Sequence, residues 1–600
     1  MDSEGLFPEP SNRARLCTRC RKLDFFVPDF LVEDTWADLK ETHNVCDFCA
    51  LRWQVCIEQN LKNTQKITFV AINSMLHLNE HADPVMSICR APGDQVFESK
   101  QESKRIKIGF PNLTASCSQH MGLMRQWLEY CDTRHHCKPQ ANSSVPTRVI
   151  DIGTEHEPTV RLCETKPGDS FRYIALSHCW GTEQHFLTTA CNLEEHKRGI
   201  PIQTLPRTFQ HAIQTTRQLG IQYLWIDSIC IIQGDHGDFD KEAEKMELVF
   251  SSAYCVLAAS SARSQQDGFL NPRKARKAVN LVKEGDARGG VYVSLFSDDF
   301  KEHVVNSPLS ERGWVLQERA LARRTIYFTE WQTYWECGDG IRCETLTLMN
   351  NNLISFLGDP NFPSKLSDGT SDRGEKIRFY EGLYKQYSRL TLSRDSDRPI
   401  AIAGLEKRLI HDLKSSGGFG VFDDERSLLP RSLLWQRGDE FPTLKKIESQ
   451  VLPRVPTWSW MAYKGGVDYL DPPFGEVAWN ISEIRGNWFG KGNRTELSAK
   501  TRLFRMTTTT TQDFDITWDI PKDIKPDVVR LKCIVVGVKM QRGVSAETKT
   551  HYVLIVRLRE YSAGLATEET EIYERVGVGK MLGLYIDLDN SQPRDWVKIR

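Results

Sequence analysis

The sequence predicts an α/β protein with an open parallel sheet, preceded by a cysteine-rich segment and followed by a β-rich region. Between residues 148 and 260, short apolar runs alternate with amphipathic helical patterns, which is typical of parallel strands joined by helical crossovers. Two C-x-x-C pairs lie within the first 50 residues, and strand-like runs dominate the last 75 residues. These three observations define the predicted organisation.

Length and composition limit the function classes. A chain of 600 residues is too long to fold around a single hydrophobic core, so we expect two to four domains. The net charge is -1, from 78 basic and 79 acidic residues, so the chain lacks the excess of positive charge that is typical of nucleic-acid-binding proteins. No apolar run approaches the length of a membrane span, and the N-terminus lacks a signal-peptide pattern. We therefore expect no nucleic-acid partner, no membrane span and a cytoplasmic location.

Cysteines in the predicted N-terminal segment, residues 1–60, indicate a metal site. The chain has 17 cysteines, an odd number that does not suggest a disulfide framework. Cys17 and Cys20 form one C-x-x-C pair, and Cys46 and Cys49 form another. Four thiolates in two such pairs suit a structural zinc ion, and His43 could replace one of them. The alternative is two unrelated pairs of reduced cysteines.

Residues 61–145 are predicted to be a connector with a strand at 67–72 and a helix at 121–130. Four potential metal ligands follow that helix: Cys131, His135, His136 and Cys137. They suit either a metal site or an exposed, polar helix end, and we favour the helix end.

The predicted parallel sheet occupies residues 146–345. A hairpin is expected first, from Arg148–Ile152 and Thr159–Cys163. Three apolar runs predict buried strands at Tyr173–His178, Tyr223–Cys230 and Tyr254–Ser260. Helices are predicted at 206–219, around 243–250 and at 311–319, with further strands at 325–328 and 333–336.

Polar residues follow each of the three apolar strands. They are Ser177, His178, Cys179 and Trp180 after the first strand, Asp227 and Ser228 in the second, and Ser260 and Ser261 after the third. Open α/β sheets bind ligands outside the carboxyl ends of their strands. The sequence therefore predicts a pocket at this edge.

Residues 346–600 form the predicted C-terminal region. A polar, glycine-rich and proline-rich stretch at 346–375 predicts a boundary loop, and a helix is expected at 379–390. The segment 456–460 is strand-like, and we expect Trp458 and Trp460 to be core aromatics. Further strands are expected near the C-terminus, at 529–538, 551–559, 573–578 and 582–588.

Several ordered blocks resemble the fungal heterokaryon incompatibility (HET) domain. The segment Tyr173-Ile-Ala-Leu-Ser-His-Cys-Trp-Gly181 resembles its first block. Leu205-Pro-Arg-Thr-Phe209 and Trp225-Ile-Asp-Ser-Ile-Cys-Ile-Ile-Gln233 are similar to its second. Gly313-Trp-Val-Leu-Gln-Glu-Arg319 resembles its third. The resemblance covers residues 145–345 strongly and the remainder loosely.

The resemblance implies a role in nonself recognition that ends in cell death. It also implies a sheet similar to Toll/interleukin-1 receptor (TIR) domains, of flavodoxin-like type, and some TIR domains cleave NAD. In that comparison, Trp314 with Glu318 four residues later resembles the pattern that carries the catalytic glutamate. The implied partners are other proteins or further copies of the chain.

Two functions remain open at this stage. One is an NAD glycohydrolase, in which Glu318 stabilises an oxocarbenium-like state and Ser177, His178, Trp180 and Asp227 line the pocket. The other, which we slightly favour, is a death-inducing interaction module without catalysis. Glu318 would then pair with Arg319 or Arg324, and Glu242 is expected to face solvent or to cap its helix.

A third function, hydrolysis by a pair formed by His178 and Cys179, is rejected. Adjacent residues of a strand point to opposite faces of the sheet, so these two side chains cannot serve as base and nucleophile.

Overall fold

The computed structural model divides into two compact units, each described separately below. The first unit comprises Met1–Glu311 and Glu318–Pro360, and the second comprises Arg312–Gln317 and Asn361–Arg600. The structure describes residues 14–25, 30–61, 66–72, 75–79, 83–90, 107–109, 113–135, 137, 144–274, 277–281, 291–345, 348–349, 373–448, 455–488, 496–505, 514–520, 531–559, 571–589 and 596–600. His136 and most of the predicted boundary loop at 346–375 lie outside these residues.

An N-terminal sheet of seven strands opens the first unit. Its main path runs β1-β2-β3-β4-β15-β14, and β5 pairs with β4. The strands are β1 (Leu31–Asp34), β2 (Ile67–Ile72), β3 (Met75–Leu78), β4 (Pro84–Arg90), β5 (Lys107–Ile108), β14 (Ala278–Asn280) and β15 (Val291–Leu295). Helices α1 (Trp36–Thr42) and α2 (Asp47–Glu58) share a core with this sheet. The predicted strand at 67–72 is confirmed, but it belongs to this sheet.

A second sheet of ten strands forms the centre of the first unit. Its order is β10-β7-β6-β11-β8-β13-β16-β17-β18-β19. The strands are β6 (Arg148–Asp151), β7 (Thr159–Glu164), β8 (Tyr173–Ser177), β10 (Ile200–Pro201), β11 (Tyr223–Trp225), β13 (Cys255–Ala258), β16 (Arg324–Phe328), β17 (Thr333–Cys337), β18 (Gly340–Cys343) and β19 (Leu348–Met349).

The ten-stranded sheet is mixed, which corrects the prediction of a parallel sheet. Neighbouring strands run parallel from β11 through β8 and β13 to β16. On both sides of this group the pairs are antiparallel, including the β6–β7 hairpin that the sequence predicted. Every residue of β8, β13 and β16 is buried, as expected for central strands covered on both faces.

Helices connect the parallel strands. They are α5 (Arg207–Gln218), α6 (Asp227–Cys230), α7 (Phe239–Ala243), α8 (Met246–Ser252) and α9 (Gly313–Leu321), and a short helix α4 (Leu193–Arg198) and the pair β9–β12 (Thr188–Thr189 and Ile232–Gln233) accompany them. The predicted strand at 223–230 is wrong beyond Trp225, because Asp227 begins a helical turn. The helix predicted around 243–250 is two short helices.

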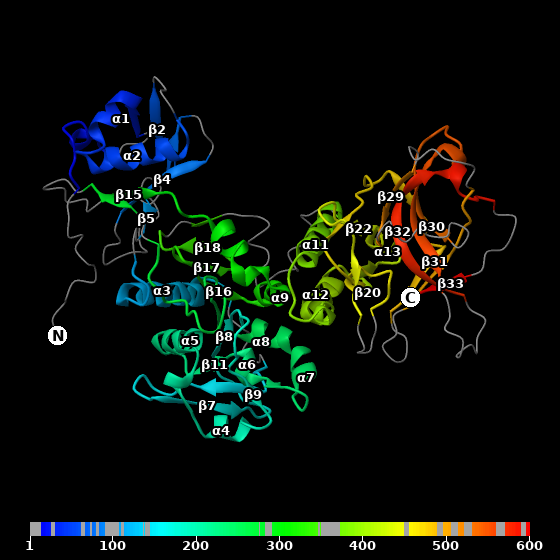
Figure 1. Ribbon diagram of the computed structural model, residues 1–600, viewed down its shortest axis with the longest axis horizontal. Coiled ribbons are helices and arrows are strands. Elements are labelled where there is room, and N and C mark those ends of the chain that lie inside the picture. The colour runs from blue at the N-terminus through cyan, green and yellow to red at the C-terminus, as the bar shows by residue number, and fades with distance from the viewer. Residues whose placement is uncertain are drawn as a thin grey trace. The chain divides into compact units, whose positions relative to one another are not determined.

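Helix α3 (Ser118–Arg134) lies beside β16 and β17 (Figure 1). Arg324 donates to the Asp132 carboxylate at 2.7 Å, and the His120 Nε2 atom lies 2.7 Å from the Thr333 hydroxyl. The helix expected within a connector is therefore joined to the central sheet by buried polar contacts.

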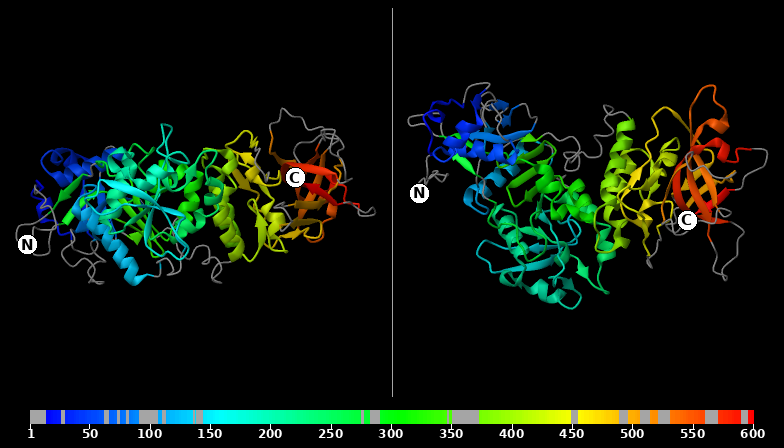
Figure 2. Two further views of the ribbon diagram at one scale, coloured as in Figure 1. Left: turned by 90° about the horizontal axis from the view of Figure 1, so that it is seen from below. Right: turned by 45° about the horizontal axis from the view of Figure 1, so that its top comes forward.

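The second unit combines helices with a sheet of eight strands, coloured orange to red in Figure 2. Its helices are α11 (Arg373–Ser388), α12 (Ala403–Asp412) and α13 (Leu428–Ser432). The sheet contains β26 (Val477–Trp479), β27 (Ile484–Asn487), β28 (Glu496–Lys500), β29 (Phe514–Trp518), β30 (Leu531–Lys539), β31 (Thr550–Leu558), β32 (Ile572–Leu582) and β33 (Trp596–Ile599). Three two-stranded antiparallel sheets precede it along the chain: β20–β21 (Ser416–Gly418, Val421–Asp423), β22–β25 (Trp435–Arg437, Val467–Tyr469) and β23–β24 (Lys445–Lys446, Tyr463–Lys464).

Two strand predictions in the second unit are wrong, although its β-rich character is confirmed. The segment 456–460 is a turn that enters a 3₁₀ helix at Trp460, and both Trp458 and Trp460 are fully buried, as expected for core aromatics. The run predicted as a strand at 582–588 is instead a 3₁₀ turn after Leu582. In the described part of the chain, no helix is both long and apolar enough to cross a membrane.

Candidate functional site

The carboxyl end of β8 meets a buried glutamate. Ser177 is the last residue of β8, and its hydroxyl donates a 2.5 Å hydrogen bond to the Glu318 Oε2 atom. Glu318 lies on α9, which ends just before β16. Only 8% of Glu318 is exposed. Two of the predicted site residues, 141 positions apart, are therefore brought together.

A second polar group continues from the same strand. The Trp180 indole donates to Asp227 Oδ2 at 2.8 Å. Asp227 begins α6, and its Oδ1 atom accepts the Ser228 backbone N–H at 2.7 Å. The His178 Nδ1 atom lies 3.8 Å from the same Oδ1 atom. The structure thus joins His178, Trp180 and Asp227 in one cluster.

Gly181 closes the turn after this cluster. Its φ angle of 83° lies in the left-handed region, which a side chain rarely adopts. A Cβ atom at this position would lie 2.5 Å from the Ser264 Cβ atom. Only glycine therefore fits both the backbone angle and the space.

Two buried hydroxyls lie close to this edge in the fold. Ser228 is in α6, and Ser260 follows β13, the strand that pairs with β8. Neither Oγ atom has a hydrogen-bond partner among the described residues. Buried hydroxyls are normally bonded, so this edge has hydrogen-bonding capacity for a polar ligand.

The arginines expected to pair with Glu318 both bind other carboxylates. Arg319 makes a bidentate pair with Glu336, at 2.8 and 3.0 Å. Arg324 binds Asp132, as described above. Glu242 was predicted to face solvent or to cap its helix. It is buried instead, and its Oε1 atom accepts from the Lys245 ammonium at 2.8 Å and the Thr147 hydroxyl at 2.9 Å.

His178 and Cys179 lie beyond the end of β8, in contrast to the prediction that both belong to the strand. Strand β8 ends at Ser177, so the alternation of side chains in a strand does not extend to these two residues. The His178 ring instead packs edge-to-face against Phe209, with ring centroids 5.1 Å apart, and faces Asp227. These contacts orient His178 toward the Asp227 cluster.

The N-terminal cysteines form a group suited to a metal ion. The ligand atoms of Cys17, Cys20, Cys46 and Cys49 all lie within 4.8 Å of one another. The Cys20 and Cys49 sulfurs are 3.6 Å apart. Each C-x-x-C pair forms a tight turn. In both pairs the backbone N–H of the second cysteine donates to the sulfur of the first at 3.5 Å.

A buried arginine lies against this group of cysteines. Arg52 is buried and donates to the sulfurs of Cys20 and Cys49 at 3.4 and 3.3 Å. Hydrogen bonds among the thiols lower the pKa of Cys46 but raise the pKa of Cys20. His43 is placed differently, since its Nδ1 atom lies 2.7 Å from the Lys40 carbonyl oxygen and its ring stacks on Trp53. The group therefore comprises four cysteines without His43.

A second group of potential ligands was only partly visible in the sequence. Cys131, His135 and Cys137 have ligand atoms within 4.8 Å of one another and of Cys337. Cys131 and Cys137 are buried, in contrast to the predicted exposed helix end. Cys337 lies 200 residues later in a strand pattern, so no local spacing could have linked it to this cluster.

Comparison with known proteins adds to this geometry. The model of the family "Heterokaryon incompatibility protein (HET)" matches residues 173–318, which run from the start of β8 to Glu318. Among curated proteins, heterokaryon incompatibility protein 6, OR allele, of Neurospora crassa is 34% identical over 92 residues. That match covers 14% of this chain and 14% of the relative. No solved structure matches the chain.

The family match and the site coincide, because Ser177, Asp227 and Glu318 all lie within the matched residues. Residues 173–318 of the chain therefore match a heterokaryon incompatibility (HET) domain, and this segment is called the HET domain below.

Proposed function

We propose that this protein acts in heterokaryon incompatibility, as a fungal nonself-recognition protein whose HET domain triggers cell death. The family match and the curated relative, which is a heterokaryon incompatibility protein, support the role. The observation that carries the proposal is the hydrogen bond between Ser177 and Glu318. It places the first and last segments of the family match at one buried polar edge.

The strand order supports a TIR-like, flavodoxin-like arrangement within the mixed sheet. Numbered along the chain, the parallel strands β8, β11, β13 and β16 lie in the order 2-1-3-4. In flavodoxin-like sheets of this order, ligands bind where the first and third strands diverge. Here these strands are β8 and β13, which end at Ser177 and just before Ser260.

A second candidate function is NAD glycohydrolysis at this edge. The bond between ribose C1′ and the nicotinamide nitrogen breaks, its electron pair leaves with nicotinamide, and water adds to C1′ to give ADP-ribose and a proton. The Glu318 carboxylate stabilises the positive charge that develops on the ribose. The Ser177 hydroxyl orients that carboxylate, and the unpartnered hydroxyls of Ser228 and Ser260 offer hydrogen bonds to the substrate.

Expression of the full chain in a fungal host tests the first function. Wild type is expected to reduce colony viability on induction. The variant Ser177→Ala, combined with Glu318→Gln, alters the edge, whereas Glu242→Gln changes another buried glutamate of the same domain and is the control. Death from the wild type and the control supports the proposal, and viable colonies with a fully expressed wild type contradict it.

Incubation of the purified proteins with NAD separates the two candidates. Nicotinamide release by the wild type, reduced about 100-fold or more by Glu318→Gln, supports catalysis, since removal of one transition-state contact costs about that much. Death without nicotinamide release, unchanged in Glu318→Gln, supports signalling by self-association and contradicts the glycohydrolase.

The four N-terminal cysteines support a further proposal, a structural zinc ion in the N-terminal module. This module comprises α1, α2 and the seven-stranded sheet. Four protein thiolates leave no open coordination position, so zinc there would stabilise the fold without performing chemistry. The buried Arg52 would offset part of the negative charge of such a centre.

A further inference from the structure

The second ligand group lies where α3 ends against the β17–β18 hairpin. Cys131 is in the last turn of α3, His135 caps the helix, and Cys137 follows two residues later. Cys337 ends β17, at the start of the tight connection to β18. Three of these side chains are buried: Cys131, Cys137 and Cys337. Two segments that are 200 residues apart thus supply one compact group.

The spacing of the ligand atoms suits tetrahedral zinc. The His135 Nδ1 atom lies 3.5 Å from the Cys337 sulfur. With zinc–sulfur bonds of about 2.3 Å and zinc–nitrogen bonds of about 2.0 Å, tetrahedral geometry separates a sulfur and a nitrogen by about 3.5 Å. All four ligand atoms lie within 4.8 Å of one another, so small side-chain adjustments bring them to one centre.

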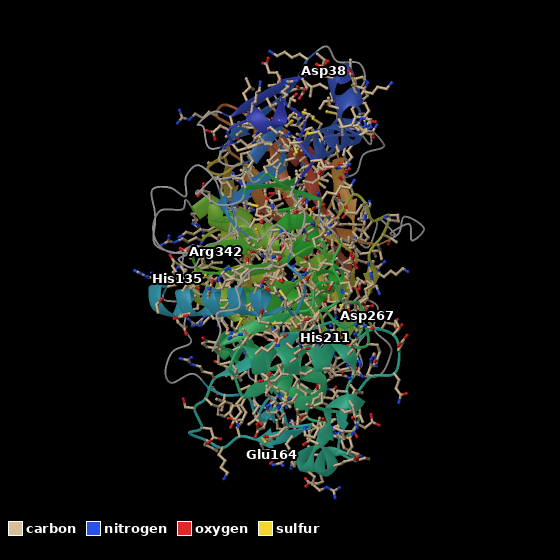
Figure 3. The ribbon with its side chains drawn as sticks, turned by 90° about the vertical axis from the view of Figure 1, so that its left-hand side faces the viewer. Asp38, His135, Glu164, His211, Asp267 and Arg342 are labelled. Carbon is tan, nitrogen blue, oxygen red and sulfur yellow. The ribbon has the colours of Figure 1, made fainter. Side chains whose placement is uncertain are left out.

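The other nitrogen of His135 is placed as in a metal-bound histidine. Its Nε2 atom lies 3.4 Å from Asp339 Oδ2, and Arg342 donates to the same oxygen at 2.6 Å. A carboxylate on the far ring nitrogen fixes the tautomer and raises the basicity of the nitrogen that binds zinc. Figure 3 shows His135 and Arg342 near one another, and Tyr130 contacts both.

A buried positive charge also lies close to this group. The buried Arg324 guanidinium pairs with Asp132, which lies in the same last turn of α3 as Cys131. Three thiolates and one neutral histidine around Zn²⁺ have a net charge of -1, which this arginine offsets. Disulfides would account for only two of the three cysteines.

We propose that Cys131, His135, Cys137 and Cys337 bind a structural zinc ion that fastens α3 to the central sheet. The site is closed, because all four positions are occupied by protein ligands. It is separate from the N-terminal cysteine group, with which it shares no residue.

Metal content of the purified full chain tests the proposal. With the N-terminal site occupied, the wild type is expected to contain two zinc ions per chain by mass spectrometry of the metal. Cys337→Ser is expected to contain one, as is Cys46→Ser, and the double variant none. Cys343→Ser changes a buried cysteine of the same hairpin outside the group and should retain two. Equal zinc content in the wild type and Cys337→Ser would overturn the proposal.

X-ray absorption at the zinc edge covers the case in which a variant does not fold. Zinc in the Cys46→Ser protein should have three sulfur ligands at about 2.3 Å and one nitrogen ligand at about 2.0 Å. The wild type should show a mixture of this centre with an all-sulfur centre. A wild-type spectrum with sulfur ligands alone would contradict the second site, whatever the variants do.

Asp339→Asn provides a gentler test, because it leaves all four ligands in place. Loss of a carboxylate partner typically lowers metal affinity about 10- to 100-fold. Competition with a chromophoric chelator should therefore remove one of the two zinc ions more readily from this variant. Asp235→Asn, which changes an exposed carboxylate, should match the wild type.

Discussion

Ser177 and Glu318, which mark the carboxyl end of β8 and the second half of α9, share a 2.5 Å hydrogen bond inside the HET domain. The carboxylate is buried, so its charge requires hydrogen-bond donors nearby. If Glu318 is catalytic, this hydrogen bond orients its carboxylate. If Glu318 is structural, the bond supplies a hydrogen-bond partner to a buried charge. Stability and activity must therefore be measured on the same variants.

Removal of the Ser177 hydroxyl should destabilise the first unit. Ser177→Ala removes a donor from a buried carboxylate, for which a cost of about 1–3 kcal/mol is typical. Hydrogen exchange of the β8 amides should report this loss. Ser251→Ala is the control, because the Ser251 hydroxyl makes only a 3.5 Å contact with the Leu248 carbonyl. Equal protection in the two variants would contradict the prediction.

The second unit should depend strongly on the ion pair between Asp519 and Arg575. Both side chains are fully buried, with Arg575 Nε 3.0 Å from Asp519 Oδ2. Asp519→Ala leaves a buried guanidinium without its carboxylate, at a cost of about 3–5 kcal/mol. Urea unfolding, followed by the fluorescence of the adjacent Trp435, should show the change.

The control for this variant lies on the same pair of strands. Asp515 pairs with Lys580 at 2.9 Å, and both side chains are largely exposed. Asp515→Ala should change stability by less than about 1 kcal/mol, as is usual for surface pairs. A similar loss in both variants would argue against a special role of the buried pair.

Glu381 should make the second unit less stable as the pH rises. Burial raises its pKa to about 7, against the opposing effect of Arg431, whose Nε atom lies 3.3 Å away. The protonated form is favoured by folding. The stabilising contribution is therefore complete below pH 4.5, the ordinary pKa of the group, and is lost as the pH rises through 7.

Glu381→Gln should flatten this pH dependence, because glutamine resembles the protonated acid. The difference between the two proteins should reach about 3 kcal/mol at most between pH 4.5 and 8. Urea midpoints of the second unit across that range provide the measurement. Parallel pH profiles for wild type and variant would show that another group is responsible.

Metal removal should unfold the N-terminal module selectively. The cysteines of this group share a core with α2 and the seven-stranded sheet, so loss of the ion should release the protection of their amides. Cys46→Ser should have the same effect as a chelator. Cys56→Ala, in the same helix but outside the ligand group, should keep its metal. Unchanged exchange after complete zinc removal would contradict a structural role.

Local patterns predicted most individual elements well. Apolar runs identified β8 and β13, and the helical pattern after Pro206 identified α5, because these signals depend on neighbouring residues alone. The prediction of a single strand at 223–230 was wrong for a physical reason. An apolar run suits a buried helical turn as well as a strand, and Asp227 starts such a turn.

Pairings between distant segments could not be predicted in the same way. The approach of Glu318 to Ser177 was expected only from the family resemblance, since no periodicity connects β8 with α9. Cys337 was missed as a potential ligand because its neighbours form an ordinary strand pattern. The antiparallel strands that flank the parallel group depend on which edges remain open after folding, which the local sequence does not specify.

The course of β14 and β15 limits how the HET segment of this chain could be exchanged. Both strands lie within the HET match at 173–318, yet they pair into the N-terminal sheet beside β4. Replacement of the whole HET segment would therefore also replace β14 and β15, two strands of the seven-stranded N-terminal sheet. The N-terminal sheet therefore depends for two of its strands on residues of the HET match, and the two parts of the first unit are not separable in sequence.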